Sequence, residues 1–463
     1  MNCTRFLAMS ALVAIAGCAQ GSMPGQSAAS GPLGTAGSPA LSGARNLRSL
    51  HRSPNTSSGK IQHVVIIFQE NRTTNDLFNG LNGAYTVRYG INSQGKQVPL
   101  QPISLTAPYD ISHSHAAFEA AYANGWDLEG SRCKAPKRCP PKDLRAFGYV
   151  PEKEVEPYFT MAQDYAFGDE MFQTNEGPSF PAHQYILSGT STISDGSSLR
   201  ASENPKIPAG KNTGGCDSPQ GSTVLLIDPY GNENQTAYPC FNRNSLIQLI
   251  EAQGLSWHYY QDKPGPGLWH GPDAILPVYN SAQFAYDVVS PPSQVLSDID
   301  AGKLANVVWV TPTAAASDHA GITDGSGPSW VASIVNQIGK SQYWSDTAIF
   351  VTWDDWGGWY DPVSPSEYNS YELGFRVPLL VISPYAKQGY VSHVQHEFGS
   401  ILKFTEQTFN LGSLGTTDVR ADDLSDCFNF SRAARKFVPI PAPHGAAYFL
   451  KQPIDRTSPD DDF

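Results

Sequence analysis

Two apolar, β-branched runs of the chain are each followed closely by two residues whose side-chain oxygens could ligate a metal. Glu70 and Asn71 follow the first run, and Asp354 and Asp355 follow the second. The runs themselves are Val64–Phe68 and Ala348–Thr352, and their continuous apolar character is typical of strands buried on both faces of a parallel sheet. Ligands of open α/β sheets bind outside the carboxyl ends of the strands, so we expect the two ends to share one site. Carboxylate and amide oxygens suit a hard divalent cation. The first hypothesis is therefore a metal site that handles phosphate; the alternative is a hydrogen-bonded loop.

A hydroxyl group that could act as a nucleophile lies in the segment Gly177–His183. Pro181 suits the first turn of a helix, and Ser179 is expected just ahead of that helix as its N-cap. There the hydroxyl would face free N–H groups and the positive end of the helix dipole, which favour a phosphate. Beside a metal, Ser179 could be deprotonated and attack phosphorus. The alternative is an N-cap without chemistry.

Histidines and tryptophans also stand near these segments. Histidine can bind a phosphoryl group, protonate a leaving oxygen or ligate a metal, although a single loop histidine more often lies at the surface. The tryptophans could line a substrate pocket or pack as core around a loop. The residues concerned are His113, His115, His319, His393 and His396, with Trp353, Trp356 and Trp359.

An alternation of strand-like and helix-like runs positions these side chains. Strands are expected at Val64–Phe68, Val307–Val310, Ala348–Thr352 and Val377–Ile382. Helices are expected at Val155–Tyr165, Pro181–Leu187, Ser245–Gln253, Trp330–Ile338 and Ser400–Phe409. The pattern predicts a three-layer α/β fold with a mainly parallel central sheet. We expect residues 61–463 to form a single domain with loop-rich insertions, including a cap or insertion near 205–242.

The N-terminus is predicted to direct export from the cytoplasm. Arg5 precedes an apolar run over residues 6–16 that is too short to span a bilayer. The run ends in Ile15-Ala16-Gly17-Cys18, which resembles a bacterial lipobox. We therefore expect residues 1–18 to be a signal peptide. Cys18 would be the lipidated residue of a cell-envelope lipoprotein. An ordinary signal peptide, giving a periplasmic or secreted protein, is the alternative. Residues 19–60 are rich in Gly, Ser, Ala and Pro and are expected to form a disordered tether.

The cysteines agree with an oxidising compartment. Cys133 and Cys139 bracket a short loop that a disulfide could close, and Cys216 and Cys240 bracket a Gly/Pro/Asn-rich stretch that a second could staple. Cys427 is left over and is expected to be a buried free thiol. No Cys-x-x-Cys spacing occurs, which disfavours a cysteine metal site.

The charge balance limits the partners. The formal net charge is −12, from 43 acidic and 31 basic residues. Binding to a phosphate backbone needs a basic surface, so we expect no nucleic acid partner. A buried, metal-assisted phosphate site remains compatible with this charge.

Three motifs, in order along the chain, resemble a known family. Glu70–Phe78 resembles the Glu-Asn-Arg-(Ser/Thr) opening motif of the bacterial phosphoesterases, which include non-specific phospholipases C and respiratory-burst-inhibiting acid phosphatases. Thr352–Asp361 resembles the second signature of that family, and Ser179–His183 resembles the nucleophile segment of the alkaline-phosphatase-like superfamily. The resemblance covers roughly Gln62–Leu411.

The resemblance implies an alkaline-phosphatase-like fold with one divalent metal ion. Ser179 would be both nucleophile and ligand, while His113 and His319 would contact the phosphate or the leaving group, and His393 matches a further family histidine. The metal could be Ca²⁺, Mg²⁺ or Mn²⁺, or Zn²⁺ or Fe if a histidine joins. The remaining ligands implied are Glu70, Asn71, Asp354 and Asp355.

The expected function is a metal-dependent phosphoric ester hydrolase that works through a phosphoseryl intermediate. The substrate would be a phospholipid, as for a phospholipase C, or a soluble monoester, as for an acid phosphatase, and the lipid anchor would make the membrane a partner. Two positions depart from the family pattern: Pro362 stands where members commonly have His, and Ala182 stands where they have Asn. They support the alternative of a catalytically impaired, surface-anchored binding protein that keeps the fold. A sulfatase is disfavoured, because its nucleophile segment needs an arginine where this chain has His183.

Overall fold

An eight-stranded sheet organises the part of the chain that the computed structural model describes, residues 57, 59–207 and 213–455. Only β17 runs antiparallel to its neighbours, so the prediction of a mainly parallel sheet is confirmed. The strands, in their order across the sheet, are β14 (Val288–Val289), β13 (Trp257–Tyr260), β15 (Val307–Val310), β1 (His63–Gln69), β16 (Thr347–Trp353), β17 (Leu379–Ile382), β8 (Ala166–Gly168) and β18 (Tyr390–Ser392).

The two strands singled out from the sequence lie side by side at the centre of this sheet. β1 and β16 pair in parallel with Gln69 opposite Trp353, so the residues that follow them leave the sheet next to each other. Residues 64–69 and 347–353 are buried throughout. Complete burial on both faces explains the continuous apolar runs.

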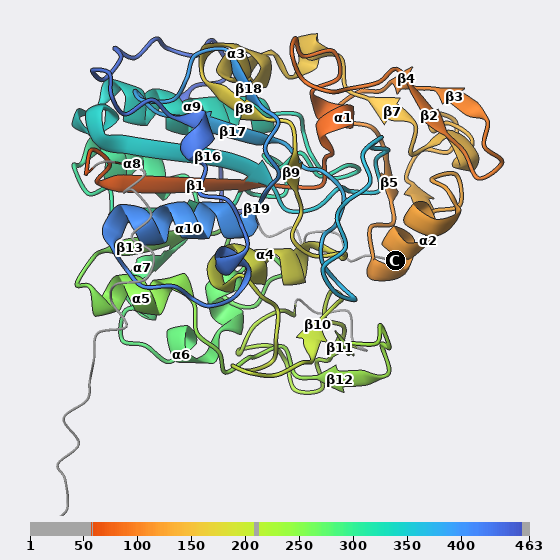
Figure 1. Cartoon of the computed structure of the whole chain (residues 1–463), viewed down its shortest axis with the longest axis horizontal. Coiled ribbons are helices and arrows are strands. Elements are labelled where there is room, and N and C mark those ends of the chain that lie inside the picture. The colour runs from red at the N-terminus through yellow and green to blue at the C-terminus, as the bar shows by residue number, and fades with distance from the viewer. Residues whose placement is uncertain (1–56, 58, 208–212, 456–463) are drawn as a thin grey trace, which may run out of the picture. The chain divides into compact units, whose positions relative to one another are not determined.

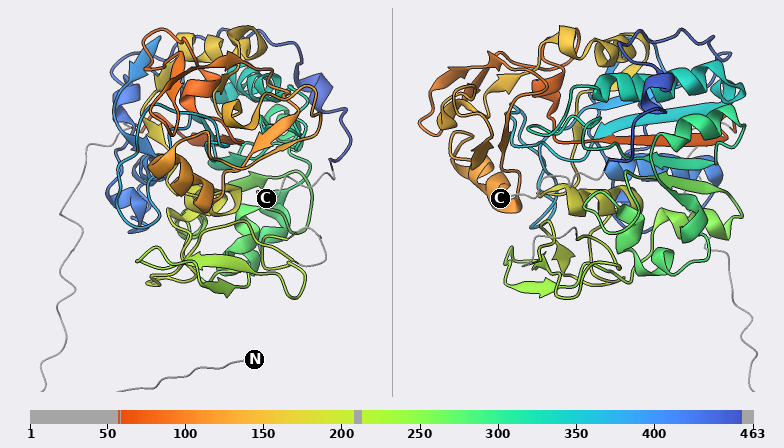
Figure 2. Two further views of the ribbon diagram at one scale, coloured as in Figure 1. Left: turned by 90° about the vertical axis from the view of Figure 1, so that its right-hand side faces the viewer. Right: turned by 180° about the vertical axis from the view of Figure 1, so that it is seen from behind.

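Helices cover both faces of the sheet, which gives the expected three layers (Figures 1 and 2). All five expected helices are present with ends shifted by no more than a turn. One face carries α3 (Glu156–Asp164), α8 (Gln294–Asp300) and α9 (Gly327–Lys340), and the other carries α4 (Ser179–Ser188), α5 (Leu246–Ala252) and α10 (Phe398–Phe409). In α9, the buried Trp330, Ile334 and Ile338 recur every four residues and turn one stripe of the helix towards the core.

Two regions extend beyond the ends of β1 and β16 (Figure 1). The first holds β2 (Tyr89–Ile91), β3 (Gln97–Pro99), β4 (Gln101–Pro102), β5 (Tyr109–Ile111), α2 (His115–Asn124), β6 (Ser131–Cys133) and β7 (Gly148–Tyr149). The second, around the predicted cap, is a three-stranded sheet of β10 (Arg200–Ala201), β11 (Val224–Ile227) and β12 (Gln235–Ala237). The remaining α-helices and strands of the described part are short: α1 (Thr74–Leu77), β9 (Met171–Phe172), α6 (Leu276–Tyr279), α7 (Phe284–Asp287), β19 (His396–Glu397) and α11 (Ala446–Phe449).

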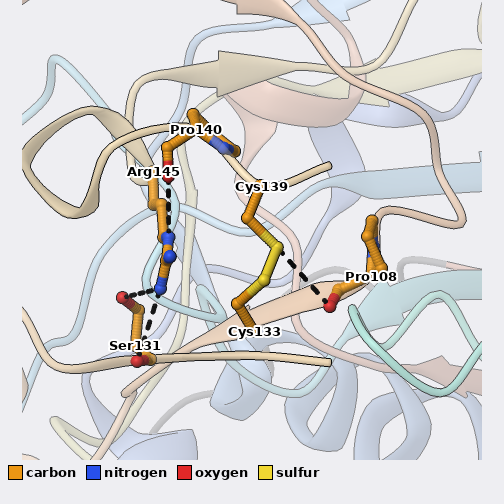
Figure 3. The surroundings of a disulfide bond; sticks show 6 residues. All are labelled: Pro108, Ser131, Cys133, Cys139, Pro140 and Arg145. Atoms are coloured by element: carbon orange, nitrogen blue, oxygen red, sulfur yellow. Dashed lines mark hydrogen bonds between the residues drawn. A yellow bond between two sulfur atoms is a disulfide. The ribbon is translucent and has the colours of Figure 1, made fainter. Parts of the chain in front are cut away.

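Both expected disulfides are present and each fastens one of these added regions. Cys133 pairs with Cys139, and Cys216 pairs with Cys240. Figure 3 shows the first bridge beside Arg145, which donates to the carbonyl of Pro140 at 3.1 Å and to Ser131 Oγ at 2.8 Å. Cys427 is free and buried, as predicted.

The predicted signal peptide, the lipidation site Cys18 and nearly all of the predicted tether lie outside the described residues. Among the residues that are described, no helix combines the length and the apolar character that crossing a bilayer requires.

Candidate active site

The ends of β1 and β16 are tied to each other by backbone and side-chain contacts. The Asn71 N–H donates to Asp354 Oδ1 at 2.9 Å, and the Asp354 N–H donates to the Gln69 carbonyl at 2.9 Å. Asn71 has a φ of 61°, in the left-handed region that a non-glycine residue seldom occupies. Such strain persists where the surroundings enforce it, often at functional sites. The two strand ends therefore lie against each other, with Asn71 and Asp354 in direct contact.

Ser179 reaches the same place from the start of α4. Its Oγ donates to Asp355 Oδ2 at 3.3 Å, and the residue is buried. The prediction that Ser179 is an N-cap is wrong, because Pro178 occupies that position and Ser179 is the first residue of the helix. The hydroxyl turns to a carboxylate instead of a backbone N–H group, which is the orientation a nucleophile needs when a base or metal must activate it.

The loop before Ser179 is held by amide side chains and close packing. The Gly177 carbonyl accepts hydrogen bonds from Gln173 Nε2 at 2.5 Å and Asn175 Nδ2 at 3.0 Å. A Cβ at Gly177 would come within 2.2 Å of the Tyr371 hydroxyl oxygen. Only glycine allows this approach, which fixes the path of the chain into α4.

His183 joins the site, although the sequence reasoning gave it no role. Its Nε2 lies 3.1 Å from Glu70 Oε1, and one donor atom each from Glu70, His183 and Asp354 lie within 4.8 Å of one another. Ser179 and His183 are four residues apart on α4, so both face the same side of the helix. That spacing is the one signal in the sequence that links His183 to Ser179.

The donor set fits a divalent cation. Glu70 Oε2, Asn71 Oδ1 and Asp354 Oδ2 are buried without a hydrogen-bond partner. Burial, and then the charges of Asp354 and Asp355, raise the pKa of Glu70 well above its ordinary value. Burial also lowers the pKa of His183, which keeps the imidazole neutral, as ligation requires. Buried acceptors with no donor are costly, and a cation would satisfy several at once.

His113 lies in the site, where it contacts Asn71. Its Nδ1 donates to the Ile111 carbonyl at 2.9 Å, so Nε2 carries the lone pair and accepts from Asn71 Nδ2 at 2.9 Å. With Nδ2 held in this way, Asn71 Oδ1 is left as the atom that can ligate a metal. The contact fixes the orientation of the Asn71 amide.

His319 stands beside His113, with ring centroids 5.7 Å apart. Its Nδ1 donates to the Ala320 carbonyl at 2.9 Å. The preceding Asp318 is anchored in the core: its backbone carbonyl accepts from Arg72 Nε at 2.9 Å, and its Oδ2 accepts from the Tyr158 hydroxyl at 2.8 Å. Arg72, the third residue of the Glu-Asn-Arg motif, therefore holds the loop that carries His319.

The structure does not bring the other named side chains into this group. The side chain of His393 is 64% exposed and pairs with Asp169 at 2.8 Å, and the buried His396 pairs with Asp422 at 2.8 Å. The tryptophans of the second motif are buried core residues, as the second of the two interpretations expected: Trp353, Trp356 and Trp359.

A model of the Phosphoesterase family matches residues 61–412. The chain belongs to this family. Similar proteins include the non-hemolytic phospholipase C of Pseudomonas aeruginosa, 25% identical over 80% of this chain and 57% of that protein. The non-hemolytic phospholipase C of Burkholderia pseudomallei is 24% identical over 84% of this chain and 61% of its own length. The phospholipase C A of Mycobacterium tuberculosis is 23% identical over 80% of this chain and 78% of that protein. The chain thus spans little more than half the length of the first two relatives.

Solved structures with a similar fold have lower sequence identity to this chain than the relatives above. A protein of the alkaline phosphatase superfamily from Vibrio parahaemolyticus is 11% identical, covers 82% of this chain and 74% of its own, and has a TM-score of 0.38. A lipoteichoic acid synthase from Listeria monocytogenes is 8% identical over 81% of this chain and 78% of its own, with a TM-score of 0.40. Similarity this low carries no functional meaning.

Proposed function

We propose that this chain is a metal-dependent phosphoric ester hydrolase that forms a phosphoseryl intermediate on Ser179. The observation that carries the proposal is the buried Ser179 hydroxyl, 3.3 Å from Asp355 and on the helix face that also presents His183. Membership of the Phosphoesterase family supports it, as do relatives named phospholipases C.

The proposed cation ligands are Glu70, Asn71, Asp354, Asp355 and Ser179, with His183 as an additional ligand. A bound divalent ion would lower the pKa of the serine hydroxyl and offset the charge on the phosphoryl oxygens. The oxygen-rich set suits Ca²⁺, Mg²⁺ or Mn²⁺, and the nearby imidazole of His183 adds Zn²⁺ to these. His113 orients the Asn71 amide, and His183 and Asp354 position Glu70.

The chemistry on the protein has two halves. The Ser179 hydroxyl loses its proton to solvent, its Oγ forms a bond to phosphorus while the bond to the leaving oxygen breaks, and a protonated His319 gives that oxygen its proton. Water then attacks the phosphoseryl group and gives one proton to His319, while the bond between Oγ and phosphorus breaks and Ser179 takes up a proton again. We assign the acid role to His319, whose ring centroid lies 5.7 Å from that of His113, and leave His113 the role of holding the Asn71 amide.

The substrate class we favour is a phospholipid, because the relatives named above are phospholipases C. A soluble monoester is the other candidate. We also propose export, with Cys18 as the lipid-bearing residue of an envelope lipoprotein. The two disulfides support an oxidising compartment.

Replacement of the nucleophile tests the proposal. Ser179→Ala should lower kcat by about four orders of magnitude or more, because the displacement loses its attacking oxygen. Ser188→Ala removes a hydroxyl at the other end of the same helix and should leave kcat close to that of the wild type. Turnover is measured on p-nitrophenyl phosphate, p-nitrophenyl phosphorylcholine and a phosphatidylcholine vesicle, after chelation and after metal is added back. Full activity of Ser179→Ala would overturn the mechanism.

The same set of substrates also distinguishes the three possible functions: a phospholipase C, an acid phosphatase and a non-catalytic binding protein. Preference for the phosphorylcholine ester and the vesicle supports a phospholipase C, and preference for the monoester supports an acid phosphatase. Binding of inorganic phosphate without turnover of any ester would instead indicate the non-catalytic binding protein that Pro362 and Ala182 left open.

A further inference from the structure

A second group of potential ligands shares no residue with the Ser179 site and has no role in the proposed reaction. It consists of His115, Glu119 and Glu176, with one donor atom from each lying within 4.8 Å of the others. His115 and Glu119 are four residues apart on α2, so they share a face of that helix. Glu176 belongs to the loop that leads to Ser179, three residues before it. The group therefore joins α2 to the nucleophile loop.

His115 has the protonation state that metal ligation requires. Its Nδ1 donates to the Glu176 carbonyl at 2.8 Å, which leaves the lone pair on Nε2. Metal-binding histidines are commonly oriented by such a bond from the other ring nitrogen to a carbonyl. The residue is 6% exposed. Its ring orientation is thus fixed before any ligand arrives.

Glu176 is buried with no partner for its carboxylate. The residue is 4% exposed, and within the described part of the chain its side chain makes no hydrogen bond and no ion pair. The backbone is fixed on both sides, since its N–H donates to the Tyr371 carbonyl at 3.0 Å and its carbonyl accepts from His115. A buried carboxylate without a partner is costly, and a cation held between it and His115 would satisfy it.

We propose that His115, Glu119 and Glu176 bind a second divalent cation of the zinc class, which fastens the start of α2 to the nucleophile loop. One imidazole and two carboxylates are a donor set that Zn²⁺ accepts with three protein ligands, whereas Ca²⁺ requires six or more oxygens. Glu119 is exposed and can rotate to close the last gap between the ligand atoms. This site is independent of the proposed catalytic role of Ser179.

The test counts the Zn²⁺ ions bound per chain and uses variants that separate the two sites. The metal-stripped full-length protein is dialysed against Zn²⁺ and its content is measured by elemental analysis. We expect two ions in the wild type, one in Asp354→Asn, one in Glu119→Gln and none in the double variant. Glu119 is exposed, so its replacement leaves the core intact. In the Asp354→Asn background, Glu119→Gln should weaken Zn²⁺ binding by about 100-fold or more, since a direct ligand contributes at least as much as an outer partner.

Glu367→Gln is the matched control, because it removes an exposed carboxylate near Glu176 that is outside the three-residue group. It should keep both ions and the wild-type thermal shift with Zn²⁺. The proposal is overturned if Asp354→Asn binds no Zn²⁺, or if Glu119→Gln matches Glu367→Gln in both stoichiometry and thermal shift. Activity is not the readout, so failure here leaves the proposed hydrolase untouched.

Discussion

Glu70 is the residue of the site whose negative charge most needs a compensating ion. It is fully buried, one of its oxygens has no hydrogen-bond partner, and two further carboxylates stand nearby. These surroundings favour the protonated acid in the metal-free protein. A divalent cation reverses that preference, since it favours the carboxylate.

The raised pKa of Glu70 gives a prediction with a definite sign. Above the ordinary value of 4.5 the unfolded chain releases this proton, while the metal-free native protein still holds it. The native state therefore binds more protons, and its free energy of unfolding falls as the pH rises. Bound metal requires the ionised acid and removes this loss. The difference in Tm between metal-loaded and chelated protein should therefore widen from about pH 5 to about pH 8.

Differential scanning calorimetry in matched buffers measures this difference in Tm. Glu70→Gln serves as the control, because it keeps the shape of the side chain and removes the titrating group. In that variant the difference should be smaller and should depend less on pH. A difference that narrows as the pH rises in the wild-type protein would contradict the explanation.

At the scale of elements, the turn after β16 holds the turn after β1 in place. Gly357 has a φ of 60°, and a Cβ at this position would lie 2.3 Å from the Asn71 carbonyl oxygen. Two things therefore require glycine here: its own backbone conformation and the close approach of the strained Asn71. Gly358 is similarly close to Ile111, two residues before His113.

Gly357→Ala should disturb the metal site through this contact. The left-handed conformation alone costs about 1–2 kcal/mol for alanine, and the clash must also displace Asn71. We expect at least tenfold weaker metal binding, about 1.4 kcal/mol or more, with a matching loss of kcat/KM. Gly254→Ala is the control, because Gly254 has a φ of 68° with no atom near its Cβ position. It should lose stability and keep metal affinity; equal metal affinities in the two variants would show that the clash is harmless.

The sequence was sufficient to predict the elements that are long or continuously apolar. β1, β15 and β16 were placed within a residue or two, because buried strands carry an uninterrupted apolar run. β8, β13, β14 and β18 were missed. β8 has three residues, and its position follows from pairing with β17 and β18, which no local pattern encodes.

The site was predictable to the same degree. Glu70 and Asp354 were predicted as site residues because each directly follows a strand. Whether His183 enters the site depends on which face of α4 packs against the sheet, and the sequence alone does not show this. The start of α4 was predicted too late in the sequence: Pro178 is the N-cap, and Ser179 is already the first residue of the helix. The position of His393 also depends on tertiary structure, because its exposed side chain pairs with Asp169 and not with the buried group.

At the scale of the whole molecule, distant segments supply one centre. The order of the strands places β1 beside β16, and α4 lies against the ends of both strands. This arrangement brings together residues 70, 71, 113, 179, 183, 319, 354 and 355. Both added regions stand on this side of the sheet (Figure 1).

The net charge of −12 affects how a membrane substrate would be met. An acidic protein is repelled by an anionic surface, and salt reduces this repulsion because the Debye length shortens from roughly 30 Å at 0.01 M to roughly 8 Å at 0.15 M. If the substrate is a phospholipid, hydrolysis of phosphatidylcholine should be faster in purely zwitterionic vesicles than in vesicles that also contain an anionic lipid. The difference should shrink as salt is added. The rate on a soluble phosphorylcholine ester, measured in the same buffers, corrects for any effect of salt on the chemistry. Faster hydrolysis on the anionic vesicles at low salt would mean that a local basic surface, and not the overall charge, governs the approach to the membrane.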